Sequence, residues 1–223
     1  MIAEIGHFAL ILALVLSVVQ CVLPLVGAAR GIGSWMALAR TAAYANALFL
    51  TISFGTLAYS FYISDFTLLN VASNSNSLLP WFYKVAASWG SHEGSILFWA
   101  LMLTWWGFLV ALTSRKLPQE TVARVLGVMG FITAGFVAFM LFTSNPFLRL
   151  FPAAPEGADL NPLLQDPGMV FHPPLLYMGY VGFTVPFAFA IAALIAGRLD
   201  AVWARWMRPW TTMAWILLTL GIS

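Results

Sequence analysis

The sequence predicts an all-α, polytopic integral membrane protein: a helical bundle with six transmembrane segments, the sixth cut short, and two long outer loops. Three observations predict this class. The 223 residues are 61% hydrophobic and 8% charged, whereas a soluble domain has about 25% charged residues. Apolar runs of about eighteen residues or more recur, and each can cross a hydrocarbon core about 30 Å thick. Finally, Lys and Arg divide unequally between the loops. The lipid bilayer is therefore the expected surrounding, and the lack of a Lys/Arg cluster argues against nucleic acid as a partner.

The first apolar run, 5–29, is too long for the core of a cleaved signal peptide, and Glu4 precedes it instead of Lys or Arg. We therefore expect a retained membrane helix. The single cysteine, Cys21, lies within this run, so the chain has neither an intrachain disulfide nor a CxxCH motif. The remaining predicted segments are 38–64, 95–113, 125–143, 175–196 and 210–223. The last has only fourteen residues, which is too short to span, so we expect either a fragment of a longer protein or a truncated reading frame.

The orientation follows from the basic residues. One set of loops holds eight of the ten: Arg30, Arg40, Arg115, Lys116, Arg124, Arg198, Arg205 and Arg208. The other set, with the N-terminus, holds the remaining two and most of the acids: Lys84, Arg149, Glu4, Asp65, Glu93, Glu156, Asp159 and Asp166. Because Lys and Arg concentrate in cytoplasmic loops, the first set is predicted to be cytoplasmic and the N-terminus to face outward.

Two outer loops, 65–94 and 144–174, have about thirty residues each. Loops of that length are usually functional or disordered. Both are rich in Trp, Phe, Leu and Pro, which is not a disordered composition. We expect them to fold back onto the outer surface of the membrane.

His172 is the strongest candidate for chemistry. It lies in 161–182, which reads NPLLQDPGMVFHPPLLYMGYVG, and we expect it just outside the fifth membrane helix. Pro173 and Pro174 follow it and suit a first helical turn, because proline has no N–H and a helix-like φ. A neutral imidazole is a common ligand of haem iron. From spacing alone, a histidine that bonds a loop carbonyl is the more common case.

A second group, WGSHEGS at 89–95, contains Trp89, His92 and Glu93 just ahead of the third membrane helix. Capping by Ser91 and a favourable position of Glu93 near the helix dipole explain the pattern structurally. The functional interpretation is that these residues line an outer cavity, in which Trp89 and its aromatic neighbours form a wall for a planar apolar ligand. An interfacial aromatic belt explains the tryptophans equally well. His7, within one turn of the interface, is expected to reach toward water and is not a site candidate.

Five blocks carry a family resemblance: VASNSN (71–76), WGSHEGS (89–95), TSNPF (143–147), DLNPLLQDPG with FHPPLLYMGYVGF (159–183), and RPW (208–210). In this order, and over nearly the whole chain, they resemble the CcmF/NrfE haem lyase family. The resemblance implies a multi-pass protein of the bacterial inner membrane, with its N-terminus and haem site periplasmic. Such proteins take haem b from the chaperone CcmE. They help to attach it to the CxxCH thiols of apocytochrome c, which CcmH/CcmI-type subunits deliver. Catalysis is then mostly proximity, since the nucleophilic thiols belong to the substrate.

In its FHPP setting, His172 matches the first of the family's two periplasmic haem-ligating histidines. The resemblance gives Trp89, His92 and Glu93 no specific role. The family's tryptophan-rich segment (WGGxWxWDPxEN), its second periplasmic histidine and the two ligands of a further, buried haem have no counterpart here. We therefore expect weak or no haem binding by these residues alone, and lyase activity only from the full-length protein in its complex. Two alternatives stay open: a haem transporter or exporter of the CcmC/CcsA type, and an inert scaffold fragment.

Overall fold

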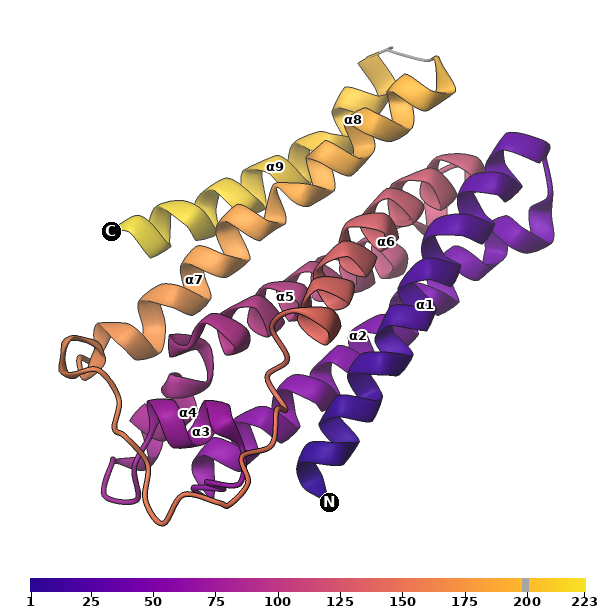
Figure 1. Cartoon of the computed structure of the whole chain (residues 1–223). Helices are drawn as coiled ribbons and strands as arrows, with labels where there is room; N and C mark the ends of the chain where they lie inside the picture. The colour runs from indigo at the N-terminus through magenta and orange to yellow at the C-terminus, as the bar shows by residue number, and fades with distance from the viewer. Residues whose placement is uncertain (198–200) are drawn as a thin grey trace.

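The computed structural model describes residues 1–197 and 201–223 and is helical throughout apart from connecting loops and one isolated bridge between Leu68 and Arg149. The predicted all-α class is confirmed over these residues. The elements are α1 (Ile2–Arg30), α2 (Gly33–Tyr62), α3 (Leu69–Asn74), α4 (Trp81–Gly90), α5 (His92–Thr113), η1 (Ser114–Lys116), α6 (Gln119–Phe142), η2 (Pro162–Leu164), α7 (Gly168–Gly182), α8 (Thr184–Ala196) and α9 (Ala201–Ile222). The long helices lie side by side as an elongated bundle (Figure 1).

Among the described residues, five helical stretches are long and apolar enough to cross a membrane. They are α1, α2, α5 with η1, α6, and α7 together with α8. The predicted sixth span is not among them. Residues 210–223 belong to a longer helix, α9, which has 22 residues and begins at Ala201. The apolar run underestimated this helix because Arg205 and Arg208 interrupt the run without interrupting the helix.

Several helices also begin before the predicted apolar runs. Helix α5 begins at His92 because the Ser91 side chain accepts a hydrogen bond from the Gly94 amide at 3.1 Å. Helix α6 begins at Gln119, and its first turns contain an ion pair between Glu120 and Arg124 at 2.6 Å, a spacing that supports an exposed helix. Hydrophobicity marks the part of a helix buried in lipid, whereas these caps and pairs extend it into the polar zone.

The predicted fifth segment, 175–196, is two helices in the structure. Helix α7 begins at Gly168 and ends at Gly182, and α8 continues from Thr184. Pro186 explains the break, because proline donates no hydrogen bond and its ring clashes with the carbonyl four residues earlier, at Gly182.

A buried polar network connects α1, α2 and α6 within the apolar core. The Asn46 amide donates to the Gln20 side-chain oxygen at 2.7 Å, and the Gln20 amide donates to the Leu126 carbonyl at 2.9 Å. Ser17, also fully buried, donates to the Ala13 carbonyl. These polar side chains are therefore paired despite their burial, as an apolar environment requires.

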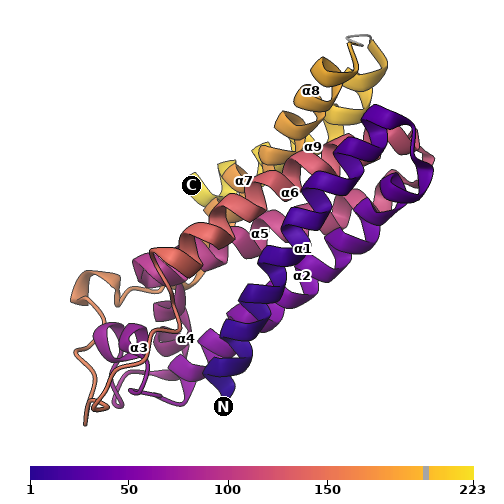
Figure 2. The same cartoon turned by 45° about the vertical axis from the view of Figure 1, so that its right-hand side comes forward.

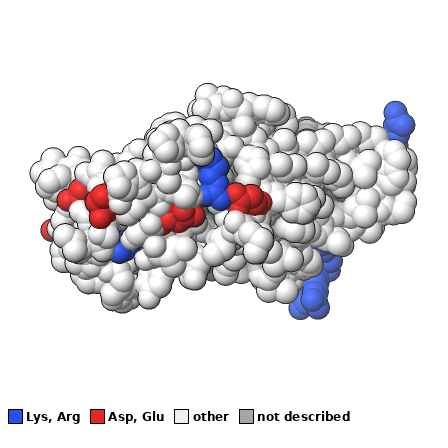
Figure 3. Space-filling view, turned by 60° about the horizontal axis from the view of Figure 1, so that its bottom comes forward, with Lys and Arg blue, Asp and Glu red and all other residues white. Residues whose placement is uncertain are grey.

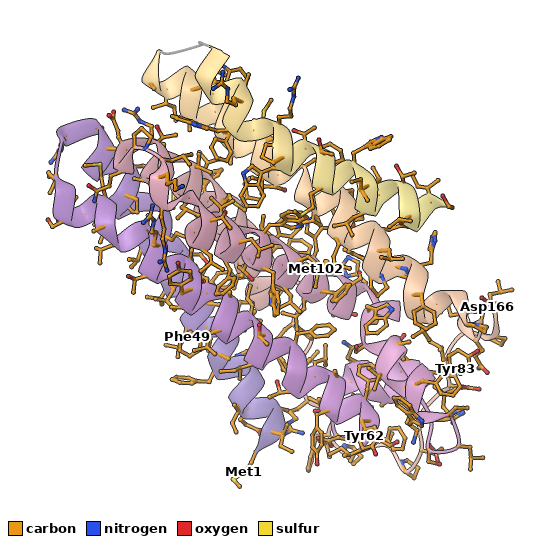
Figure 4. The ribbon with its side chains drawn as sticks, turned by 180° about the vertical axis from the view of Figure 1, so that it is seen from behind. Met1, Phe49, Tyr62, Tyr83, Met102 and Asp166 are labelled. Atoms are coloured by element: carbon orange, nitrogen blue, oxygen red, sulfur yellow. The ribbon has the colours of Figure 1, made fainter. Side chains whose placement is uncertain are left out.

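The two long loops meet at one end of the bundle, here called the loop end (Figures 1 and 2). The first loop folds into α3 and α4, and the second crosses over it. Backbone hydrogen bonds join them: Leu69 N to Leu148 O, Leu150 N to Thr67 O, and Ala158 N to Ala72 O, at 2.9, 2.9 and 2.7 Å. Met1, Tyr62, Tyr83 and Asp166 all lie toward this end (Figure 4). The loops are thus ordered by each other, not merely by their composition.

Charges divide between the two ends of the molecule. Figure 3 shows the acidic side chains over the left and central part of this face, with some Lys and Arg among them, and other Lys and Arg side chains projecting at the right. At the loop end, Arg149 pairs with Glu4 and lies 3.7 Å from Asp65. The opposite end, here called the basic end, carries the basic set predicted from the loops, except that Arg198 lies outside the described residues.

Candidate functional site

His172 lies inside α7, in its second turn, so the prediction that it precedes the helix was wrong. The helix begins early because Asp166 forms a turn that leads into it: its side chain accepts from the Gly168 amide at 2.7 Å, and its carbonyl accepts from the Met169 amide at 2.9 Å. Pro173 is consequently a helix-interior residue. A proline there leaves the carbonyl four residues earlier, that of Met169, without its usual donor.

Trp89 supplies the missing donor. Its indole Nε1–H donates to the Met169 carbonyl at 3.0 Å. The Trp89 ring also stacks on Phe98, with ring centroids 5.5 Å apart, and on Phe54 at 6.4 Å. Phe54 and Phe98 also contact each other, with centroids 5.1 Å apart, so the indole joins one aromatic cluster while its polar edge fixes the start of α7 one turn before His172. Trp89 is placed to hold the segment that carries His172.

An aromatic column continues from Trp89 along the contact between α5 and α7. The Phe98 and Tyr177 rings meet edge to face at 5.2 Å, and Trp99 contacts Tyr180 in the same manner at 5.0 Å. Deeper in the bundle, Trp106 donates to the Met178 carbonyl at 3.1 Å. Two tryptophan N–H groups therefore attach α7 to the rest of the bundle, which makes its first turns a rigid support.

The His172 side chain itself is exposed and, within the part of the chain that the structure describes, makes no hydrogen bond, ion pair or ring contact. It lies one turn before Leu176 on the side of α7 that α9 covers. Gly221 of α9 packs on the Leu176 backbone, and Leu218 packs on Gly179 so closely that a side chain at Gly179 would overlap it. Helix α9 thus covers this side of α7 as far as Leu176, one turn after His172.

His92 and Glu93 are the first two residues of α5, some distance along the chain from His172 but at the same end of the bundle. The His92 Nδ1 lies 3.0 Å from the Ser144 hydroxyl, and its ring meets Phe139 edge to face. Glu93 is half-buried in the first turn of the helix. The capping role expected of Ser91 is confirmed. No contact joins His92 or Glu93 to His172 among the described residues.

His7 has a partner that the sequence did not indicate. Asn145 Oδ1 accepts from the Phe147 amide at 2.9 Å, which is common turn chemistry for asparagine. That bond orients the other end of the amide, Nδ2, toward His7 Nδ1 at 3.2 Å. Consecutive residues, Ser144 and Asn145, therefore contact the two histidines of α5 and α1. The TSNPF block was the available signal, but its long-range contacts depend on how α1 and α5 pack.

The chemistry available at this end is thus one uncommitted imidazole on a rigid helix. Within 1–197 and 201–223, no group of three or more His, Cys, Asp or Glu residues is placed to hold a metal ion. A protein holds haem iron through axial side chains, of which histidine is a common one. Among the described residues, His172 is an exposed histidine without a hydrogen-bond partner.

Five helical stretches long and apolar enough to cross a membrane define a multi-pass helical membrane protein, with an exposed histidine at its loop end. Comparison with known proteins identifies the class further. The family described as Cytochrome C assembly protein matches residues 89–223. The chain belongs to this family, and the resemblance found in its sequence blocks is confirmed.

Individual relatives agree with this assignment. The chain is 60% identical over 223 residues to the cytochrome c-type biogenesis protein CcmF of Pseudomonas aeruginosa and 55% identical to that of Escherichia coli, in each case over the whole chain and 34% of the relative. It is 47% identical to the NrfE protein of Haemophilus influenzae. A solved structure named Cytochrome c Heme Lyase CcmF matches 99% of this chain and 35% of its own, with a TM-score of 0.87 and 30% identity. The chain therefore spans about a third of the length of these relatives.

Proposed function

We propose that this chain forms the N-terminal part of a cytochrome c haem lyase and that His172 is an axial ligand of the haem to be attached. The observation that carries this proposal is the exposed imidazole of His172, which has no hydrogen-bond partner among the described residues and lies on a helix fixed by Trp89 and Asp166. Membership of the cytochrome c assembly family supports haem attachment as the reaction. Neutral histidine is a common axial ligand of haem iron.

In this proposal the chain holds haem b, received from the CcmE chaperone, beside the thiols of apocytochrome c brought by CcmH/CcmI-type subunits. The thiols are the nucleophiles, so the contribution of the chain is proximity and orientation. A rigid α7 suits that role, because a ligand on a mobile loop would not fix the haem vinyl groups. Trp89 acts as a positioning residue in this scheme. His92 and Glu93 are proposed to border the same outer space, with no direct bond to the haem.

The loop end is proposed to face the periplasm, with the chain in the bacterial inner membrane. The concentration of Lys and Arg at the opposite end supports this orientation, since these residues favour the cytoplasmic side. The packing of α9 on α7 also supports a position for a second haem ligand near His172. Leu218 packs on Gly179 and Gly221 packs on Leu176, so a chain that continues α9 by another turn passes beside His172.

The test compares three histidine variants of the protein as its own gene encodes it, in membranes where CcmE supplies haem. His172→Ala is expected to abolish the spectrum of the haem delivered by CcmE and to stop cytochrome c maturation. His7→Ala and His92→Ala are matched controls at the same end of the bundle and are expected to keep that spectrum. Unchanged maturation in His172→Ala would refute the site assignment, and loss of the spectrum in all three variants would indicate damage to the loop end instead.

A further inference from the structure

The basic end contains an apolar groove that the proposed haem chemistry does not use. Its volume is about 380 Å³, and it lies between the end of α5, helix α8 and the first half of α9. That volume is within the range of about 300–1,000 Å³ seen for small-molecule sites. The residues that shape it are chiefly apolar and aromatic: Leu117, Phe189, Trp206, Trp210 and Met213, with Arg205 among them.

The hydroxyl groups along the groove are already engaged within the protein. The hydroxyls of Thr113 and Ser114 both donate to carbonyls one turn back in α5. The Ser114 carbonyl in turn accepts from Arg40 at 2.8 Å. Arg205 is exposed and, among the described residues that line the groove, is the one charged side chain; it has no ion pair there. The groove thus combines an apolar wall with a single uncompensated positive charge.

A neighbouring cavity provides a contrast. It has a volume of about 170 Å³ and lies on the other side of Phe189 and Trp206, against the start of α6. It too contains a guanidinium group, that of Arg124, but Glu120 pairs with it at 2.6 Å. Its charge is therefore neutralised within the protein, so of these two cavities the Arg205 groove is the one that attracts an anion.

We propose that this groove binds one anionic phospholipid, with an acyl chain against Leu117, Phe189 and Met213 and the phosphate at Arg205. Charge complementarity identifies the occupant. A zwitterionic lipid carries no net charge for Arg205 to attract, whereas basic residues next to membrane helices favour anionic headgroups by about fivefold each. Trp206 and Trp210 suit this depth, since tryptophan collects at the level of lipid headgroups.

The experiment measures lipid retention by native mass spectrometry on the protein as its own gene encodes it, purified in detergent and depleted of lipid. Dioleoylphosphatidylglycerol or dioleoylphosphatidylcholine is then added. We expect one phosphatidylglycerol to be retained in preference to phosphatidylcholine and Arg205→Gln to lower that retention about fivefold. Arg208→Gln is the matched control, because Arg208 is an exposed arginine of the same helix that does not line the groove. Equal retention of the two lipids, or equal effects of the two variants, would overturn the proposal.

A second variant tests the acyl-chain contact independently of charge. Met213→Trp fills the groove while Arg205 stays, and it is expected to abolish retention of phosphatidylglycerol with an unchanged helical circular dichroism spectrum. If Met213→Trp retained phosphatidylglycerol as the wild type does, the acyl chain would not lie in this groove and the proposal would be overturned. Displacement of phosphatidylglycerol by excess inorganic phosphate would show a site for free anions and would also overturn the lipid assignment.

Discussion

Replacing Trp89 by Phe tests whether the indole N–H holds the start of α7. The change keeps an aromatic ring against Phe54 and Phe98 and removes only the donor to the Met169 carbonyl, at 3.0 Å in the structure. Pro173 offers that carbonyl no alternative amide. Leaving a half-buried acceptor without its donor costs about 1–2 kcal/mol. That cost corresponds to about a 5- to 30-fold larger population of the locally open state.

Hydrogen exchange in detergent measures this opening. Amide exchange in 168–172 is expected to accelerate about 5- to 30-fold in Trp89→Phe, while α1 and α2 exchange as in the wild type. Trp81→Phe is the matched control, since Trp81 lies in the same short helix and is 65% exposed.

A double variant makes the test specific to this carbonyl. Pro173→Ala restores a backbone N–H that can bond Met169 within the helix, so Trp89→Phe should cost much less when combined with it. An equal cost with proline or alanine at 173 would refute the reasoning, because the Met169 carbonyl would then not be the group that Trp89 satisfies.

Three further predictions concern other regions. Gly179→Ala is expected to lower the free energy of unfolding in detergent by about 1–3 kcal/mol, because a Cβ there overlaps α9. Gly55 has open space around it, so Gly55→Ala is expected to be neutral or to stabilise α2 by up to about 1 kcal/mol. The Ser77 hydroxyl, followed by the backbone amides of Gly157 and Ser77, holds the pKa of Glu156 below its ordinary value of 4.5. Stability from this contact is present above that value and lost as the pH falls through the lower, folded pKa, so protease cleavage of the two loops should rise only in acid, and Glu156→Gln should remove that pH dependence. The 223 residues alone are expected to show little haem absorbance, and a stoichiometric haem spectrum that depends on His172 would contradict this.

The helical class and the membrane spans followed from hydrophobicity because each apolar run must satisfy its backbone within one helix. The end of each helix depends on polar contacts, and these were predicted less well. His172 is the clearest case. The proline pair alone predicts a helix start, yet a turn at Asp166 starts the helix earlier, and Trp89, eighty residues from Met169 in the chain, supports it. Asn145 forms a local turn with Phe147, but its bond to His7 depends on α1. Such partners are far apart in the chain, so the local sequence does not predict them.

The polar network of Gln20 and Asn46 has a consequence for how the protein is made. Helices α1 and α2 can pair with each other as soon as both have entered the bilayer, and the Asn46–Gln20 bond forms within that pair. The Gln20 amide, however, reaches its acceptor only on α6, at Leu126. Until α6 inserts, this donor lies in lipid without a partner or stays near water. The hydrogen bonds of Gln20 are therefore complete only after α6 has been synthesised, about a hundred residues later. Pauses in translation before that point should leave the Gln20 side chain accessible to water-soluble reagents.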